Sequence, residues 1–371
     1  MVKVRDIVKR FMEFAPAFMA EDGDPIGLQL GSQESEVNKV MVTLDVRPEV
    51  VREAVQAGVD FIFAHHPAMF HPIKQFDLAD PQNRMYAELL KHHITVFAAH
   101  TNLDNANGGM NDWLAEKMGL RQTAILMPER VEPMFKLAVF VPREAAEGMR
   151  SALAAAGAGK IGNYDDCSYS YEGYGRFRPN EQAEPAIGER EELTTVREEK
   201  VEVLFPAHQK EPILKAMYAA HPYEEPVFDL FQTAGMGQKY GMGRIGTLAE
   251  TQTVRQYAEF CKEIFKVSAL RMVAADPDKK IDRVAVLGGS GGQFYTAAKQ
   301  RGAQLYVTGD ISYHTGHDIL AAGLAALDPG HHIESICKEK LATLFTTWNN
   351  ENNWKLEIIA SKLKTDPFIF V

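Results

Sequence analysis

The chain has 371 residues, which is long enough for two domains that each have a hydrophobic core. Apolar residues make up 46% and charged residues 24% of it, as in typical globular proteins, and no apolar stretch is long enough to span a bilayer. The formal net charge of −10 argues against a nucleic-acid-binding surface, because such a surface must neutralise phosphates. We therefore expect neither nucleic acid nor a membrane as a partner.

The three cysteines, Cys167, Cys261 and Cys337, are single and far apart in the sequence. This pattern predicts neither a disulfide framework nor a thiolate zinc site. Residues 1–16 have the amphipathic pattern of a helix and lack the continuous apolar region of a signal peptide. We expect a cytoplasmic protein.

Residues 1–127 alternate between predicted strands and helices. The strands are VNKVMVTLDV, DFIFAH and ITVFAAH, and the helices cover 3–14, 48–57, 81–92 and 108–118. The alternation resumes after about residue 245, with strands at GRIGTLAE, RVAVLGG and QLYVTGD, helices at 253–265 and 292–301, and a final helix and strand. This rhythm predicts an α/β fold whose two halves contain βαβ units and a largely parallel sheet.

Residues 128–235 differ in character from both halves. They are predicted to form a strand and a helix, a segment rich in glycine, tyrosine and acidic residues, and then a strand, a helix and a strand. That order matches the ferredoxin-like unit, whose ends lie close together and suit an insertion. The segment HPYEEPVFDL, residues 221–230, resembles the PII and CutA families. We expect an inserted PII/CutA-like domain here.

His65 and His66 directly follow an apolar strand-like run at 59–64. Neutral imidazole is a good ligand for zinc, iron, nickel and copper, and two adjacent rings on a loop can point toward different ions. A second strand-like run, at 94–99, is followed by His100, Asn102 and Asp104. Asp104 is a candidate ligand because a carboxylate can bridge two cations; the alternative is that Asn102 and Asp104 only form the turn before Gly108.

Two further segments have the same design. A strand at about 303–308 precedes Asp310 and His314, and a helix is predicted to begin near His331 after Pro329-Gly330. On a helix His331 and Glu334 share one face, as a metal-binding His/Glu pair requires. Glu334 could instead be a first-turn acid that favours the helix dipole. All these candidates follow strands or start a helix, and ligands of open α/β sheets collect beyond the carboxyl ends of strands.

The segments AHHP, HTNLDNANGGMNDWLA, VTGDISYH and DPGHHIE, in this order, resemble the dinuclear-metal-centre family. Its members are labelled GTP cyclohydrolase 1 type 2 homologues or NGG-interacting-factor-like proteins. The resemblance covers roughly residues 1–127 and 236–371, which we expect to form one metal-binding domain around the insert at 128–235. It implies two divalent ions per chain, zinc, iron, manganese or nickel, with zinc expected in a crystal. The implied ligands are His65, His66, Asp104, His331 and Glu334.

The sequence departs from the family pattern in two places. Many relatives space the last His and Glu by four residues, whereas Glu334 lies three residues after His331 and two after His332. Helical geometry favours His331 as the ligand, with His332 as the alternative. The stretch EDGDPIGLQLGS resembles a family motif but lacks its Trp and Asn, which leaves the role of Asp24 open.

Other residues are candidates for roles around the metals. Asp310, His314 and Asn102 could orient ligand rings or act as general acid or base, and we assign the catalytic role to His314 and Asp310. The string VAVLGGSGG could let an anionic substrate approach, so Gly289, Ser290 and Asn102 are the candidate substrate-binding residues. Tight strand-to-helix packing is the alternative explanation of these glycines.

Two functions are compatible with these patterns. The first is a metal-dependent hydrolase of the GTP cyclohydrolase type, acting on a nucleotide or a similar small anion. The second is a non-catalytic metal-binding chaperone, sensor or scaffold whose PII-like domain binds an effector. The two family resemblances together imply a homohexamer built from trimers.

Overall fold

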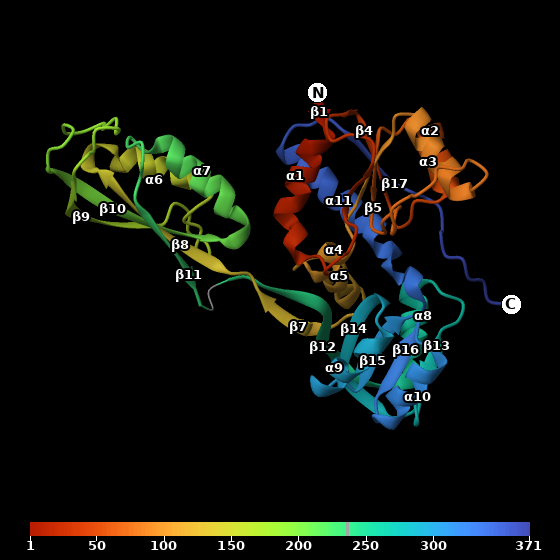
Figure 1. Cartoon of the computed structure of the whole chain (residues 1–371). Coiled ribbons are helices and arrows are strands. Elements are labelled where there is room, and N and C mark those ends of the chain that lie inside the picture. Colours follow the sequence, from red (N-terminus) through yellow and green to blue (C-terminus); the bar gives the residue numbers. More distant parts are fainter. Residues whose placement is uncertain (235–236) are drawn as a thin grey trace. The chain divides into compact units, whose positions relative to one another are not determined.

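The structure, a computed structural model, describes residues 1–234 and 237–371 and divides into two compact units (Figure 1). Unit 1 consists of Met1–Glu129 together with Tyr240–Val371, and unit 2 of Arg130–Lys239. The prediction of an α/β fold is confirmed, although the sheets of unit 1 are mixed rather than purely parallel.

The first sheet of unit 1 has the strand order β17-β4-β5-β6-β2. Strands β17 (Glu357–Ala360), β4 (Lys39–Thr43), β5 (Phe61–Ala64) and β6 (Thr95–Ala98) are parallel, whereas β2 (Gly27–Leu30) is antiparallel to β6. Short strands β1 (Val2–Lys3) and β3 (Glu36–Val37) pair separately. The side chains of β5 and β6 are all buried, as expected for central strands covered on both faces.

The helices of the first half are α1 (Val4–Phe14), α2 (Pro48–Ala57), α3 (Pro81–Lys91), α4 (Thr101–Asn105) and α5 (Met110–Lys117), with a 3-10 turn η1 (Ala17–Met19). Phe63 of β5 lies at the centre of the core. Its ring centroid is 4.7 Å from that of Phe11 on α1 and 4.8 Å from that of Phe345 on the C-terminal helix α11 (Ile336–Glu351). This aromatic contact joins the two halves of the chain.

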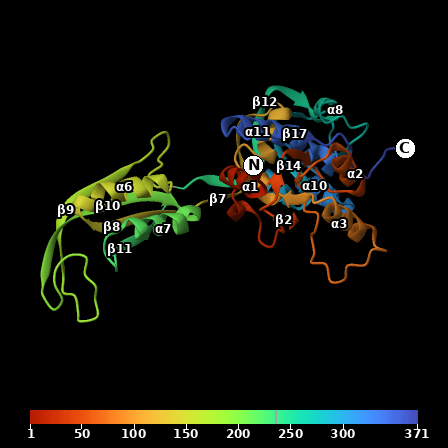
Figure 2. The same cartoon turned by 90° about the horizontal axis from the view of Figure 1, so that it is seen from above.

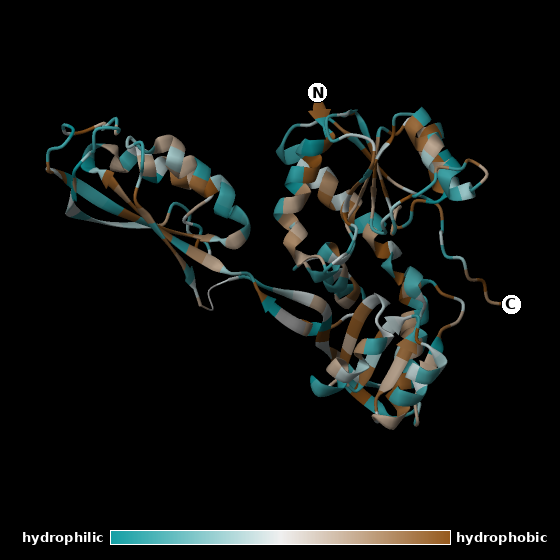
Figure 3. Cartoon of the chain, viewed as in Figure 1, coloured by the Kyte–Doolittle hydropathy of each residue, from teal (hydrophilic) through white to brown (hydrophobic). Residues whose placement is uncertain are grey.

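The second sheet of unit 1 has the order β13-β16-β15-β14-β12-β7. Its strands are β7 (Arg121–Val131), β12 (Lys239–Thr253), β13 (Arg271–Val273), β14 (Lys280–Ser290), β15 (Leu305–Gly309) and β16 (Ala325–Asp328). Strands β14, β15 and β16 are parallel, and their apolar residues appear brown in Figure 3. The remaining helices are α8 (Val254–Phe265), η4 (Gly292–Phe294), α9 (Tyr295–Gln300), α10 (Tyr313–Ala321) and η5 (His331–Ser335).

An ion pair holds the segment between α4 and α5 against β12. Arg244, whose side chain is 3% exposed, places Nε and Nη2 2.7 Å from the two carboxylate oxygens of Asp112. The same guanidinium donates to the carbonyls of Ala106, Gly241 and Gly243. Through Asp112 and Ala106, Arg244 therefore ties α5 and the segment before it to β12, while its bonds to Gly241 and Gly243 lie within β12.

Unit 2 is a four-stranded antiparallel sheet in the order β11-β8-β10-β9. Its elements are β8 (Met134–Pro142), η2 (Arg143–Ala145), α6 (Ala146–Ala155), β9 (Ser168–Phe177), β10 (Thr194–Pro206), η3 (Ala207–Gln209), α7 (Lys210–Ala220) and β11 (Phe228–Thr233). Alternate residues such as Leu137, Val139, Val201 and Val203 pack with Met149 of α6 and Met217 of α7 in one core. The helices thus cover one face of the sheet, and Figure 2 shows the long loop that joins β9 to β10.

Candidate metal centre

The two adjacent histidines sit where the sequence places them, at the carboxyl end of β5. The N–H of His65 donates to the carbonyl of Thr43 and that of His66 to the carbonyl of Leu44, so the backbone after the strand stays paired with the segment that follows β4. The two ring centroids lie 4.9 Å apart, and the ring planes are inclined at 43°. The chain therefore presents two imidazoles side by side at one edge of the sheet.

His65 is fully buried, and only one of its ring nitrogens has a hydrogen-bond partner among the described residues. Nδ1 lies 2.8 Å from the carbonyl oxygen of Ala99, which can only accept, so Nδ1 carries the proton. Nε2 then has a free lone pair, 3.6 Å from Oδ1 of Asp104 and 3.8 Å from Oε2 of Glu334. An unpartnered buried lone pair aimed at two carboxylates is what a metal-ligating imidazole requires.

His66 is held by a carboxylate on each side. Its Nδ1 lies 2.6 Å from Oδ1 of Asp45, and its Nε2 lies 3.1 Å from Oε2 of Glu334. Burial alone would lower the pKa of His66, but the hydrogen bonds to Asp45 and Glu334 outweigh burial and raise this pKa to about 10. Asp45 comes two residues after the end of β4, and its carboxylate contacts the ring directly.

His331 and Glu334 lie on η5, a 3-10 turn that precedes α11. Residues i and i+3 eclipse each other in a 3-10 helix, and Nε2 of His331 lies 3.1 Å from Oε2 of Glu334. Nδ1 of His331 lies 2.7 Å from Oδ2 of Asp310, and Asp310 adopts a φ of 56°, which is rare for a residue other than glycine. The hydrogen bond to Glu334 is the largest cause that raises the pKa of His331 to about 9.

Glu334 is 2% exposed and occupies the middle of the site. Burial would raise its pKa, but the hydrogen bonds from His331 and His66, together with the nearby ring of His65, hold that pKa well below the usual value. Gly289, with a φ of 62°, makes room for the carboxylate, since a Cβ there would lie 2.9 Å from Oε1 of Glu334. Ser290, the other predicted substrate-binding residue of this strand, is exposed.

Asp104 lies on the short helix α4 and is 9% exposed. Its Oδ1 has no hydrogen-bond partner among the described residues, while its backbone carbonyl accepts from Nδ2 of Asn111. Burial, and then repulsion from the nearby Glu334 carboxylate, raise the pKa of Asp104 to about 8. Two carboxylates that face each other in a buried site need a proton or a cation between them.

His100 belongs to the same site, although the sequence analysis did not select it. Its ring centroid is 5.3 Å from that of His65 and 5.6 Å from that of His66. Nδ1 of His100 lies 2.9 Å from Oδ1 of Asp24, whose second oxygen accepts from Thr101, so this is the role of Asp24 that the sequence left open. The signal was present, because His100 follows β6 just as His65 follows β5.

Other predicted residues lie outside this group. His314 is exposed near the start of α10, where its ring packs on Tyr313, and it is not in any of the clusters of potential ligands found among the described residues. Asn102 is fully buried, and its Nδ2 donates to the carbonyl of Ala15 at the end of α1. His332 is absent from the clusters as well, and burial lowers its pKa.

Among the residues that the structure describes, three sets of side chains in unit 1 could hold a metal ion, because the ligand atoms of each set lie within 4.8 Å of one another. These sets are His65, Asp104 and Glu334; His66, His331 and Glu334; and His65, His66 and His100. The first two sets share Glu334. The orphaned Nε2 of His65 and Oδ1 of Asp104 show that the donor atoms fit a cation better than they satisfy one another.

A family model described as Duf34/NIF3 (NGG1p interacting factor 3) matches residues 2–367. The chain belongs to the NIF3 family. Among its curated relatives are proteins called GTP cyclohydrolase 1 type 2 homolog. The one from Bacillus subtilis is 42% identical over 370 residues, covering 100% of this chain and 99% of the relative, and the one from Listeria innocua is 43% identical over 359 residues, covering 96% of each.

Solved structures of the NIF3 family have the same fold. A Bacillus cereus protein related to NIF3 superposes with a TM-score of 0.89 at 41% identity, and a Staphylococcus aureus protein with a TM-score of 0.78 at 30% identity. Each comparison covers 100% of this chain and 99% of the other. The family resemblance predicted from the motifs is confirmed. Within the described residues, no helix is long and apolar enough to cross a membrane.

Proposed function

We propose that this chain binds two divalent metal ions and uses them to hydrolyse a nucleotide or a similar small anionic molecule. The observation that carries this proposal is the position of Glu334. Its buried carboxylate belongs to two ligand sets at once, one with His65 and Asp104 and the other with His66 and His331. A carboxylate shared in this way is suited to bridging two cations.

The donor set also limits the metal. Imidazole nitrogens and carboxylate oxygens suit zinc, iron, manganese and nickel, and the absence of a thiolate from the three described ligand sets disfavours cuprous ion. Cys337 is buried near the site, but burial raises the pKa of its thiol well above the usual value, so the thiol stays protonated. His100 adds a third imidazole beside His65 and His66.

When bound, a pair of such ions acidifies water and polarises a phosphoryl or carbonyl oxygen. The protein residues supply orientation and proton transfer. Asp45 and Asp310 accept the Nδ1 protons of His66 and His331, which directs both Nε2 atoms into the site. Asp24 holds Nδ1 of His100 in the same way, so the other ring nitrogen of His100 can hold or move a proton near the reacting group.

The nature of the substrate is proposed from two observations. The curated relatives carry the name GTP cyclohydrolase 1 type 2 homolog, which points to a guanine nucleotide. In addition, β14 ends beside the site in glycines, with Gly289 next to Glu334 and Ser290 exposed. Small residues there leave room for an anionic group to approach.

The test is GTP turnover by the metal-loaded protein, followed by chromatography of the products. We expect Asp104→Ala to abolish turnover and Asp318→Ala, an exposed aspartate on α10, to leave it unchanged. Loss of turnover in Asp104→Ala alone would support a metal-dependent hydrolase. If metal-loaded protein converts neither GTP nor other nucleotides, the catalytic proposal fails.

Unit 2 supports the second candidate, a metal-binding regulator. Its element order, strand–helix–strand–strand–helix–strand, and its strand order β11-β8-β10-β9 are those of a ferredoxin-like unit, so we propose that 128–235 is an inserted PII/CutA-like domain. Such a domain would bind a small-molecule effector. PII and CutA relatives assemble as trimers. We therefore also propose a homohexamer built from trimers.

A further inference from the structure

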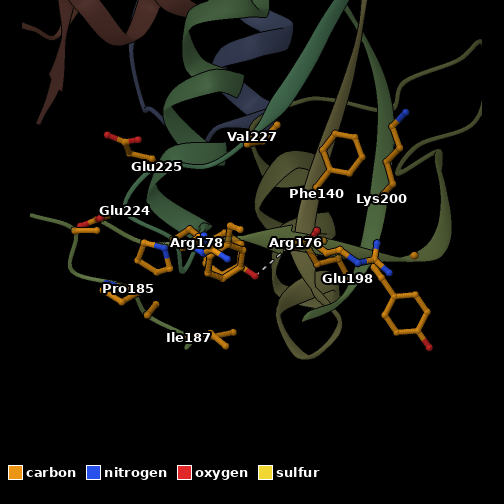
Figure 4. A pocket seen from close by; sticks show the side chains of 18 of the residues that line it. Phe140, Arg176, Arg178, Pro185, Ile187, Glu198, Lys200, Glu224, Glu225 and Val227 are labelled. Atoms are coloured by element: carbon orange, nitrogen blue, oxygen red, sulfur yellow. Dashed lines mark hydrogen bonds between the residues drawn. The ribbon is translucent and has the colours of Figure 1, made fainter. Parts of the chain in front are cut away.

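Unit 2 contains a cavity of about 660 Å³ on the face of its sheet opposite α6 and α7 (Figure 4). The strand register explains the hollow. Tyr171, Gly173, Gly175 and Phe177 alternate along β9, and Gly173 pairs with Glu198 of β10. Because side chains alternate between the faces of a sheet, two aromatic rings stand at the ends of a row whose two middle positions have no side chain. A Cβ on Gly173 would meet nothing within 4 Å.

The floor of the cavity carries a carboxylate. Glu198 is 8% exposed, and its Oε1 accepts a hydrogen bond of 2.9 Å from the hydroxyl of Tyr223. Gly175 permits this arrangement, since a Cβ there would lie 2.2 Å from Oε2 of Glu198. Among the described residues no Lys, Arg or His forms an ion pair with Glu198. The carboxylate therefore retains acceptor capacity that faces the cavity.

Two arginines lie in and just after β9, the edge strand of this sheet, at the rim of the cavity. Arg176 and Arg178 are exposed, and neither forms an ion pair with any residue in the described part of the chain. Lys200 lies over the ring of Phe140, with Nζ 5.2 Å from its centroid. Figure 4 shows Glu224 and Glu225 on the side of the cavity away from Lys200, and the Glu224 carboxylate accepts from the backbone N–H of Glu184.

We propose that this cavity binds a nucleotide whose base carries an amino group. Three chemical features converge on that class. Aromatic faces from Tyr171, Phe177 and Tyr223 can stack on a planar base. The Glu198 carboxylate accepts from an exocyclic amine, as carboxylates do from cytosine N4. Unpaired arginines bind phosphate through two parallel N–H donors.

The size of the cavity agrees with this ligand class. Small-molecule sites in proteins commonly enclose about 300–1,000 Å³. All residues of the cavity belong to unit 2, and none belongs to the ligand sets of the metal centre. The proposal is therefore independent of the hydrolase proposal and survives its failure.

The experiment is calorimetric titration of the full-length protein with GTP, ATP and UTP, repeated with Asp104→Ala to separate this site from the metal centre. We expect GTP and ATP to bind both proteins, and UTP, which has no exocyclic amine, to bind at least about tenfold more weakly. Gly173→Leu fills the cavity without a clash and should abolish binding in both backgrounds. Gly148→Leu, also in open space but on α6, is the matched control.

A second pair of variants tests the phosphate side. Arg176→Ala combined with Arg178→Ala should weaken GTP binding about tenfold or more, whereas Arg197→Ala, whose guanidinium pairs with Glu172 outside the cavity, should not. Three results would overturn the proposal: no saturable binding of GTP or ATP to Asp104→Ala, unchanged binding by Gly173→Leu, or equal affinity for UTP. If Asp104→Ala binds neither GTP nor ATP, and Gly173→Leu also changes the oligomeric mass of the protein, the cavity is a contact between subunits instead.

Discussion

The carboxylate of Asp310 lies 2.7 Å from Nδ1 of His331, and the backbone of Asp310 is in the left-handed region with a φ of 56°. The structure therefore maintains an unfavourable backbone conformation at a residue whose side chain orients the ring of a candidate ligand. Such outlying conformations persist where the surrounding structure enforces them, often at functional sites.

Asp310→Ala should weaken metal binding about 10–100-fold, as loss of a carboxylate partner of a ligating histidine typically does. Asp310→Asn should weaken it less, because asparagine tolerates positive φ and its side-chain oxygen still accepts from Nδ1. Competition with a chromogenic chelator measures the affinity. Equal affinities for wild type and Asp310→Ala would remove Asp310 from the site.

The number of ions lost on mutation tests whether Glu334 is shared. Glu334→Gln should lose both ions, because the carboxylate belongs to both ligand sets. His331→Ala should lose one ion and keep the ion at the set of His65, Asp104 and Glu334. Metal content by mass spectrometry, with circular dichroism to confirm folding, decides the matter. One ion retained by Glu334→Gln would show that Glu334 serves a single metal.

Metal binding should strengthen as pH rises. Without metal the pKa of His66 is raised to about 10 and that of His331 to about 9, so both rings are protonated at neutral pH and must release protons to act as ligands. At pH values below these pKa values, each proton that the metal displaces raises the apparent metal affinity about tenfold for every unit by which the pH rises. Zinc competition assays from pH 6 upward, within this window, measure the slope; a flat profile would show that the imidazoles are already neutral.

The Arg244–Asp112 pair should stabilise unit 1 strongly. Arg244→Ala removes one partner of a buried pair and leaves the three carbonyls without their donor, which should cost about 3–5 kcal/mol. The control is Arg255→Ala on α8, whose pair with Asp278 is exposed to solvent and screened by it, so its loss should barely change the stability. Urea unfolding followed by tryptophan fluorescence compares them, and similar midpoints for the two variants would contradict the prediction.

The homohexamer is tested by light scattering coupled to gel filtration. We expect a mass close to six times the chain mass of 41.4 kDa. A monomer would refute the assembly that we propose from the two family resemblances. A trimer would support only the trimeric association proposed from the PII/CutA resemblance of unit 2.

The positions of the candidate ligands were predictable because these residues follow strands. Apolar runs before His65 and Asp104 mark buried strands, and parallel strands bring their carboxyl ends to one edge. His331 and Glu334 were predictable from spacing, although they lie on a 3-10 turn where an α-helix was expected. In both geometries residues i and i+3 share a face, so the pairing did not depend on the type of helix.

The partners of the ligands were harder to predict. Asp24 lies 76 positions from His100 in the sequence, and Thr365, which donates to Asp45, comes from the C-terminal segment. No periodicity links such residues, because the contacts arise only when the sheet and the tail are packed. His314 follows the same strand as Asp310, yet α10 carries it to the surface; its catalytic role stays a prediction that His314→Ala in the GTP assay would test.

The contact between His66 and Glu334 joins positions 268 residues apart, with unit 2 encoded between them. During synthesis the first histidines leave the ribosome long before the carboxylate that completes both ligand sets. A nascent chain can therefore hold its early ligands only as an incomplete site. On the proposed function, loading of two metal ions therefore requires a chain that has been synthesised at least as far as Glu334.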